Sequence, residues 1–199
     1  MRIAQIAPLY ESVPPKLYGG TERVISSLTE ELVRLGHEVT LFASGDSETQ
    51  AQLVPACSRA LWRDGDCRET LPHHVRLLEL VFQDVSRFDV LHFHCDYLHF
   101  PLLRRYPCPS VTTLHGRLHI SDLQPLFAEY AEVPLVSISN DQRRPMPGPT
   151  GRQPSTMVSP GTCIPSGSSL AITWRSSAAF LPRSDWTGPS RSPAARVGS

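Results

Sequence analysis

The chain has 199 residues, and its 19 basic and 19 acidic side chains give a formal net charge of zero. This balance lacks the basic excess that nucleic-acid-binding proteins carry, so no nucleic-acid partner is expected. No apolar run approaches the about 18 residues that suggest a membrane-spanning helix, so no membrane span is expected either. The N-terminus also lacks the apolar stretch and cleavage site of a secretion signal.

The neutral total hides two parts of opposite charge. Residues 1–147 carry 14 basic and 18 acidic side chains, a net charge of −4, whereas residues 148–199 carry five arginines and one acid, a net charge of +4. Ser, Pro and Gly make up 24 of the last 52 residues, a composition that buries too little apolar surface to fold. We therefore predict one folded domain over residues 1–147, followed by a disordered tail over residues 148–199.

The cysteines favour a reducing compartment. Their number is odd, their spacing is irregular, and no secretion signal accompanies them, so free thiols are expected rather than a disulfide framework. The protein is therefore expected in the cytoplasm. The five residues are Cys57, Cys67, Cys95, Cys108 and Cys163.

Short apolar runs in the first part predict five buried strands. Residues at helical spacing predict three helices, over 21–36, 75–85 and 123–130. In the first of these, Thr21 is the expected N-terminal cap and Gly36 the C-terminal stop, while residues 47–70 show no clear period. The expected strands are 2–7, 37–43, 89–94, 110–114 and 135–139, and the apolar stripe of the first helix is Val24, Leu28, Leu32 and Leu35.

Alternating strands and helices predict an α/β fold, a Rossmann-like doubly wound parallel sheet. In such sheets ligands bind beyond the carboxyl ends of the strands. The residues that directly follow each strand are therefore the candidates for a functional site.

The turn Gly19-Gly20-Thr21 opens the first helix. Its free backbone amides and the helix dipole suit an anion such as a diphosphate. The full dinucleotide-binding pattern, with three spaced glycines directly after a strand, is absent. A plain turn from loop to helix is the alternative.

Histidines and a carboxylate gather after the third expected strand, at His92, His94, Asp96 and His99. Two histidines and a carboxylate can hold iron or zinc. Substrate contact by His94 or Asp96 is favoured over a metal site, and core packing is favoured for His92. After the fourth strand, His115 can donate to a substrate oxygen and Gly116 lets a ligand approach the backbone, although this pair could also simply cap the strand.

Five ordered segments resemble the N-terminal domain of family 4 glycosyltransferases, which have the GT-B fold. The resemblance covers roughly residues 1–147 and rests on MRIAQIAP, YGGTERVISSLTEELVRLGHEVTLFASGDS, DVLHFHCDYLHFPL, TTLHGRL and PLVSISNDQRR. It implies two Rossmann-like domains that face each other across a cleft, the first holding the acceptor and the second the nucleotide-sugar donor. It also implies retention of anomeric configuration, no metal and no cofactor, since the nucleotide-sugar is a substrate.

The resemblance also implies roles for single residues. Gly19, Gly20 and Thr21 would approach the donor diphosphate, and His115 would be the catalytic-site residue that meets the transferred sugar. The acceptor pocket would be lined by His94, Asp96, Gly116 and Arg117. Nucleotide-sugar and acceptor small molecules are then the expected partners, and the oligomeric state stays open.

The tail has the composition of a frame-shifted translation of a GC-rich gene. The chain has one lysine, Lys16, against 18 arginines. Reading each tail codon one base earlier allows ANW, HHGIP, YLAFLGRISPEK and LDRAIEIARRAG, in the order in which family 4 glycosyltransferases continue. We therefore interpret residues 148–199 as out of frame, through one base lost near the codons for Pro147 and Gly148. A natural Pro/Ser-rich tail is the alternative.

Two functions follow. The first is a truncated, inactive fragment of a family 4 glycosyltransferase whose donor half is lost. The second is a non-catalytic Rossmann-like module that binds a sugar or a nucleotide. A metal-dependent enzyme that uses His92, His94 and Asp96 is a third and weaker reading.

Overall fold

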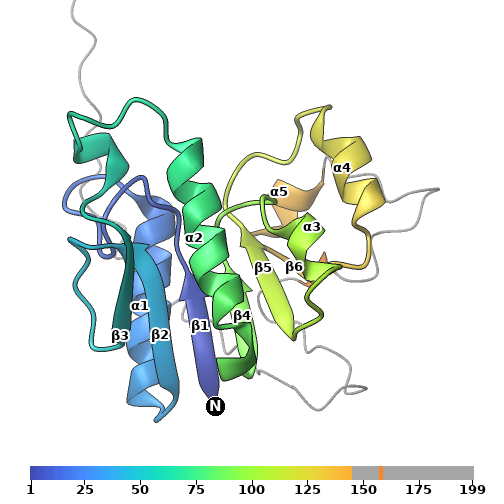
Figure 1. Cartoon of the computed structure of the whole chain (residues 1–199). Coiled ribbons are helices and arrows are strands. Elements are labelled where there is room, and N and C mark those ends of the chain that lie inside the picture. The colour runs from blue at the N-terminus through green and yellow to red at the C-terminus, as the bar shows by residue number, and fades with distance from the viewer. Residues whose placement is uncertain (145–156, 159–199) are drawn as a thin grey trace, which may run out of the picture.

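The computed structural model describes residues 1–144 and the backbone of residues 157–158. Its strands form one parallel sheet in the order β3-β2-β1-β4-β5-β6-β7 (Figure 1). The predicted Rossmann-like parallel sheet is thus confirmed. The strands are β1 Arg2–Ile6, β2 Glu38–Ser44, β3 Gln52–Cys57, β4 Val90–Phe93, β5 Ser110–Leu114, β6 Leu135–Ser137 and β7 Met157–Val158.

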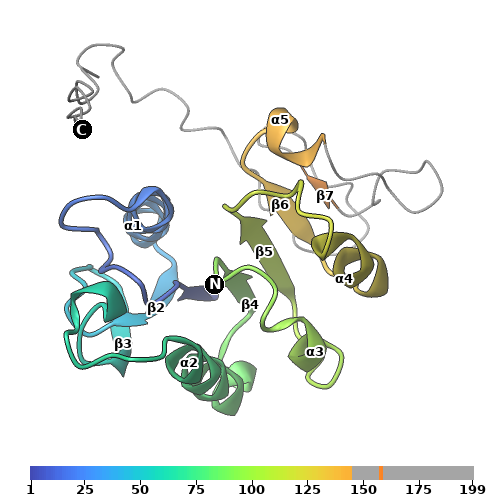
Figure 2. The same ribbon diagram turned by 90° about the horizontal axis from the view of Figure 1, so that it is seen from above.

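Helices cover both faces of this sheet. Helix α1 lies on one face, and α2, α3 and α4 lie on the other (Figure 2). Two short 3₁₀ turns, η1 and η2, precede and follow α2. The bounds are α1 Gly20–Arg34, η1 Leu61–Arg63, α2 Leu71–Gln83, η2 Val85–Arg87, α3 Phe100–Leu103, α4 Leu123–Glu129 and α5 Asn140–Arg143.

The sheet face under α2 is apolar. Phe42, Ile6 and Phe93 lie side by side in register on β2, β1 and β4, and all three are buried. The ring of Phe82 from α2 stacks on Phe93 with 6.2 Å between centroids. Each such side chain contributes about 1.5–3 kcal/mol when it is fully buried, so this face supplies the main core.

The opposite face is different in chemistry. Leu41, Gln5 and His92 form the next row in register, and they point away from α2 because side chains alternate along a strand. Gln5 is fully buried and His92 is nearly so. A buried polar side chain costs free energy unless it is hydrogen-bonded, so this row has to be paired within the fold.

The expectations for α1 were partly wrong. The helix begins at Gly20, with Gly19 as N-cap and no side-chain cap, so Thr21 already lies inside the first turn and does not cap it. The buried positions are Glu22, Ile25 and Thr29, whereas Val24 and Leu35 of the predicted stripe are 44% and 57% exposed. Leu28 and Leu32 of that stripe are partly buried. Hydropathy alone excludes a buried glutamate and threonine, and the predicted stripe was therefore displaced from the most buried positions. Gly36 does end the helix, with a φ of 82° that favours glycine.

Several elements were not predicted. Strand β3 contains Pro55, which lacks an N–H, and it lies at the sheet edge, where a strand tolerates proline. Helices α3 and α5 have four residues each, too few to show a period. Strand β7 falls within the tail predicted to be disordered and pairs with β6 through backbone groups, which any sequence can supply. The remainder of that tail lies outside the described residues.

Two other expectations concern the whole chain. No helix among the described residues combines the length and apolar character needed to cross a membrane. Cys57, Cys67, Cys95 and Cys108 are free thiols, as predicted, and Cys163 lies outside the described residues.

Candidate functional site

The carboxyl ends of β1, β4 and β5 meet at one edge of the sheet, at the top of Figure 1. The backbone N–H of His94, directly after β4, donates to the carbonyl of Ile6 at the end of β1, with 2.9 Å between N and O. His115 directly follows β5, the next strand along. The sheet order thus brings side chains that are 21 to 89 positions apart into contact.

Four hydrogen bonds link side chains of three neighbouring strands into one polar row that ends at this edge. Its members are Gln5, His92, His94, Thr113 and His115. Nε2 of His94 lies 3.0 Å from Oε1 of Gln5, and Nδ1 of His94 lies 2.9 Å from Nε2 of His115. On the other side of the amide, Nε2 of Gln5 lies 3.4 Å from Nδ1 of His92, and Nε2 of His92 lies 2.8 Å from Oγ1 of Thr113. The sequence predicted histidines at this edge, but gave no sign that Gln5 links them.

The histidines of this row are neutral near pH 7. Burial lowers the pKa of His92 to about 3 and that of His115 to about 4, and it holds the pKa of His94 well below its usual range. A neutral imidazole has one N–H and one lone pair. Each ring in the row therefore carries a proton on one nitrogen and a lone pair on the other.

His94 and His92 are both enclosed. Each uses its two ring nitrogens in the hydrogen bonds above and is nearly or fully buried. His94 is therefore linked to the exposed edge of the sheet by its hydrogen bond to His115, whose side chain is partly exposed. His99, the fourth predicted member of the cluster, lies apart from them, stacked on Phe93 with 3.7 Å between ring centroids.

Asp96, Gly116 and Arg117 lie at the exposed edge beyond β4 and β5. Asp96 has a φ of 50°, the left-handed region that few residues other than glycine adopt. A Cβ on Gly116 would stand 3.7 Å from Oδ1 of Asp96, which is ordinary contact, so the two residues are neighbours. Packing around the carboxyl raises the pKa of Asp96.

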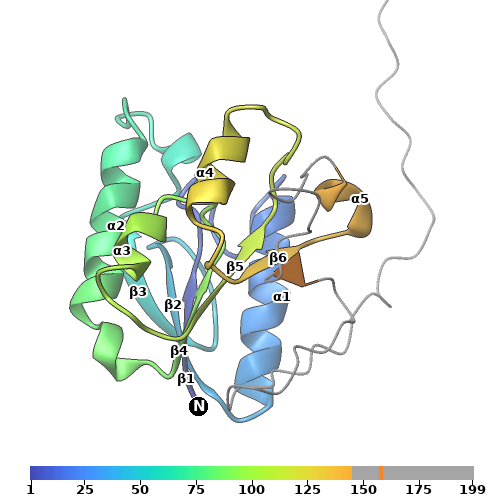
Figure 3. The ribbon, with the colours of Figure 1, turned by 90° about the vertical axis from the view of Figure 1, so that its right-hand side faces the viewer.

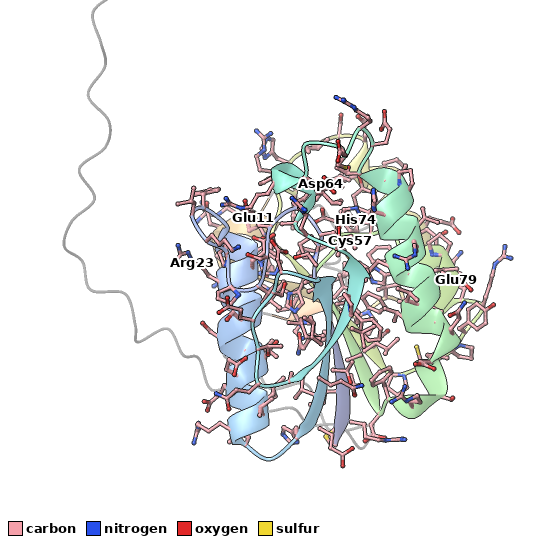
Figure 4. All side chains as sticks on the ribbon, turned by 60° about the vertical axis from the view of Figure 1, so that its left-hand side comes forward. Glu11, Arg23, Cys57, Asp64, His74 and Glu79 are labelled. Atoms are coloured by element: carbon pink, nitrogen blue, oxygen red, sulfur yellow. The ribbon has the colours of Figure 1, made fainter. Side chains whose placement is uncertain are left out.

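The loop after β1 is held against α2 by His74, which the sequence did not single out. The backbone N–H of Leu9 donates to Nε2 of His74 across 3.2 Å, and Nδ1 of His74 lies 2.9 Å from the carbonyl of Thr70. The ring of Tyr10 packs on His74 with 4.8 Å between centroids. Figure 4 shows His74 at this upper end of α2, with Glu11 nearby on the loop.

Trp62 extends this stack to the surface. Its ring lies 5.2 Å from that of Tyr10, and its side chain is 66% exposed. The backbone N–H of Trp62 donates to the backbone carbonyl of Tyr10 across 3.1 Å. Beside it, Nε of Arg63 forms an ion pair with Glu11 across 3.1 Å. These contacts join residues more than 50 positions apart, and nothing in the spacing of the sequence reveals them.

The glycine turn before α1 is shaped by its own side chains. A Cβ on Gly19 would stand 2.7 Å from Pro15 and 2.8 Å from the carboxylate of Glu22, so the close approach is internal. Gly20 faces open space. Burial raises the pKa of Glu22, and a hydrogen bond from its own backbone N–H partly offsets this. A carboxylate thus lies in the same turn as the predicted diphosphate site, next to Gly19 and away from the open side of Gly20.

The family model described as Glycosyltransferase Family 4 matches residues 18–144. The chain belongs to this family. Among solved structures, it is similar to a glycosyltransferase from Rickettsia africae ESF-5, with 14% identity and a TM-score of 0.54 over 80% of this chain and 42% of that one. At this identity the likeness shows the fold alone. A comparison with curated proteins found no match.

Two further structures resemble this family 4 domain. AviGT4, a glycosyltransferase involved in avilamycin A biosynthesis, is 21% identical, and MurG from Acinetobacter baumannii is 10% identical. Both have a TM-score of 0.47, and the alignments cover 80% and 79% of this chain. They cover 41% and 45% of the other chains, so the family 4 domain spans less than half the length of the three structures described.

Two hollows in the family 4 domain lie at the opposite edge of the sheet. One, of about 370 Å³, is lined at the amino ends of β1 and β2 by residues that include Arg2 and Glu38. The other, of about 450 Å³, lies beside Ser110 and Pro134, at the amino ends of β5 and β6. Within residues 1–144 and 157–158, no group of three or more His, Cys, Asp or Glu side chains is arranged to hold a metal ion.

Proposed function

We propose that this domain is the acceptor side of a retaining glycosyltransferase that transfers a sugar from a nucleotide-sugar to a small-molecule acceptor. The observation that carries the proposal is the family match over residues 18–144. The placement of His115, Asp96, Gly116 and Arg117 at the carboxyl edge of the sheet supports it, because ligands of such sheets bind there.

In this proposal His115 contacts the transferred sugar. Its neutral, partly exposed ring suits hydrogen bonding to a sugar better than charge stabilisation. Asp96, Gly116 and Arg117 face the acceptor. The carboxylate of Asp96, whose pKa is raised, is suited to accept a hydrogen bond from an acceptor hydroxyl.

The diphosphate leaving group gains negative charge as the sugar departs, and prepositioned amides stabilise such charge. The N–H groups of Gly20 and Thr21 at the start of the 15-residue helix α1 are the proposed donors. The carboxylate of Glu22 opposes this role while it is ionised. We therefore propose that the diphosphate approaches from the open side of Gly20, and that the cations needed for transfer come from a second domain.

The shifted reading frame after Pro147 belongs to the same proposal. Residues 148–199 lie outside the described part of the chain, apart from β7. If their frame is shifted, the chain as written lacks the donor-binding half and transfers little or no sugar, since positioning and charge stabilisation need both halves. Cytoplasmic placement and the absence of a metal or cofactor are likewise proposed.

The test compares the chain as written with the product of a gene in which one base is restored near the codons for Pro147 and Gly148. Both are assayed for nucleotide release from UDP-, GDP- and ADP-linked sugars in the presence of a sugar acceptor panel. The restored chain should release nucleotide, and its His115→Ala variant should lose roughly a hundredfold in kcat. Nucleotide-sugar binding without transfer by the restored chain would favour a non-catalytic module instead.

A further inference from the structure

The polar row described above has a direction. The amide of Gln5 presents its oxygen to His94 at 3.0 Å and its nitrogen to His92 at 3.4 Å. An amide oxygen only accepts and an amide nitrogen only donates. Nε2 of His94 must then carry the proton that lies between it and Gln5.

The remaining protons follow from this one. Because His94 is neutral and protonated at Nε2, its Nδ1 is a lone pair. That lone pair lies 2.9 Å from Nε2 of His115, so His115 donates from Nε2. His115 is neutral as well, and its Nδ1 therefore carries no proton. Among the described residues, no hydrogen bond reaches this nitrogen.

We infer that Gln5 and His94 are positioning residues that set the tautomer of His115, so that the site recognises the transferred sugar through a hydroxyl that donates to the unprotonated Nδ1. Contact between His115 and the transferred sugar rests on the proposed function, whereas the tautomer of His115 does not. This reverses the expectation from the sequence, in which His115 donates to a substrate oxygen. It also defines a specificity: at the sugar position that faces His115, a hydroxyl fits and a carboxylate, which can only accept, does not.

The two residues that set the tautomer of His115 are buried. Gln5 is 0% and His94 3% exposed. Water therefore cannot compete for their hydrogen bonds, or freely exchange the protons on Nε2 of His94 and Nε2 of His115 that form them. A reversed amide would reverse every bond in the row and place a proton on Nδ1 of His115. One glutamine that touches no ligand would thus decide whether the site accepts or donates.

The test is nitrogen NMR on the full chain labelled with ¹⁵N-histidine at neutral pH, which distinguishes protonated from unprotonated ring nitrogens. In the wild type, His115 should show a protonated Nε2 and an unprotonated Nδ1. The His115→Asn variant assigns the signals. A wild-type spectrum in which Nδ1 of His115 carries the proton overturns the inference without any variant.

Two substitutions at Gln5 separate positioning from packing. Gln5→Leu keeps the approximate volume and removes the amide, so His115 should become a mixture of both tautomers. Gln5→Glu restores an oxygen that accepts from Nε2 of His94, so the wild-type tautomer should return. A His115 tautomer that is unchanged in Gln5→Leu, or not restored in Gln5→Glu, contradicts the inference.

The matched control lies on the other face of the sheet. There Nε2 of His99 contacts Oγ1 of Thr112 across 2.7 Å, the same chemistry as the His92–Thr113 pair. Thr112→Val should change the signals of His99 and leave those of His115 in place. Because the readout needs neither donor nor acceptor, failure of the tautomer inference and failure of the glycosyltransferase proposal remain distinguishable.

Discussion

The two faces of the sheet are built from neighbouring residues of the same strands, and they differ in the interactions that their side chains make. Under α2 the strands present Ile6, Phe42 and Phe93, which pack with other apolar side chains. On the other face β1 and β4 present Gln5 and His92, and the amide nitrogen of Gln5 donates to Nδ1 of His92. Apolar packing tolerates exchange of similar volumes, whereas a directional polar row does not. Both faces therefore contribute to stability, the second also through the apolar contacts of Leu41 and Ile25, and only the second presents the polar row at the candidate functional edge.

Acid should lower the stability of the fold through its buried histidines, those of the polar face among them. The unfolded chain takes up protons on its histidines below about pH 6.5, whereas folded His92 and His115 remain neutral down to about pH 3 and 4. Their contribution is thus present above pH 6.5 and is lost as the pH falls. Between pH 7 and 5 each of these histidines should cost about 2 kcal/mol of unfolding free energy, measured by urea denaturation.

A variant checks the source of this loss. His92→Asn should reduce the fall in unfolding free energy between pH 7 and pH 5 by about 2 kcal/mol, the contribution of one histidine. Equal unfolding free energies of the wild type at the two pH values would show that the row is protonated without cost, contrary to its burial.

The apolar face is tested by Phe93→Ala. Phe93 is fully buried between Phe82 and His99, so the variant should lose about 3–5 kcal/mol of unfolding free energy at pH 7. Val24→Ala on α1, whose side chain is 44% exposed, is the control and should change stability by about 0.5 kcal/mol or less. Similar losses in both variants would mean that α1 packs as tightly as the main core.

The apolar face also contains one polar pair, which sharpens the comparison. Nδ1 of His99 has no hydrogen-bond partner among the described residues, so Thr112→Val would leave the buried ring without any. We expect a loss of about 1–3 kcal/mol in urea denaturation. Thr112→Ser keeps the hydroxyl and should recover most of it. If the serine variant is as unstable as the valine variant, packing rather than the hydrogen bond holds His99.

The smallest effect concerns the edge next to α1. Glu22→Gln removes a buried negative charge beside Gly19, so inorganic diphosphate should bind at this turn roughly fivefold more tightly, about 1 kcal/mol. Isothermal titration at low salt measures this. Glu31→Gln, at the exposed far end of α1, is the control. Unchanged affinity in Glu22→Gln would place the diphosphate away from this turn.

The sequence predicted the parts of the fold that depend on local pattern. The short apolar run at residues 2–7 predicted β1, and β5 was predicted at residues 110–114 as the structure has it. The edge strand β3 contains Leu53 and Val54, but the Pro55 that follows them argues against a strand, because proline lacks the N–H that an interior strand requires. The buried side of α1 was missed because Glu22 and Thr29 occupy it.

The site was predicted only where its residues follow a strand. His94, Asp96 and His115 meet that rule, and the structure places them at one edge. Gln5 lies in the middle of β1, and its role depends on β4 being the neighbour of β1, a fact of sheet order. His74 binds the backbone of Leu9 from 65 residues away. Pairings of this kind come from tertiary structure and have no local signal.

Strand β7 bears on how the molecule behaves in solution. Figure 3 shows it beside β6, at the edge of the sheet away from β3, and its two residues pair with Leu135 and Val136. An uncovered strand edge is a template on which another copy of a protein can assemble. A chain shortened to residues 1–144 lacks β7 and leaves the backbone edge of the three-residue strand β6 uncovered. We therefore expect such a chain to self-associate through β6.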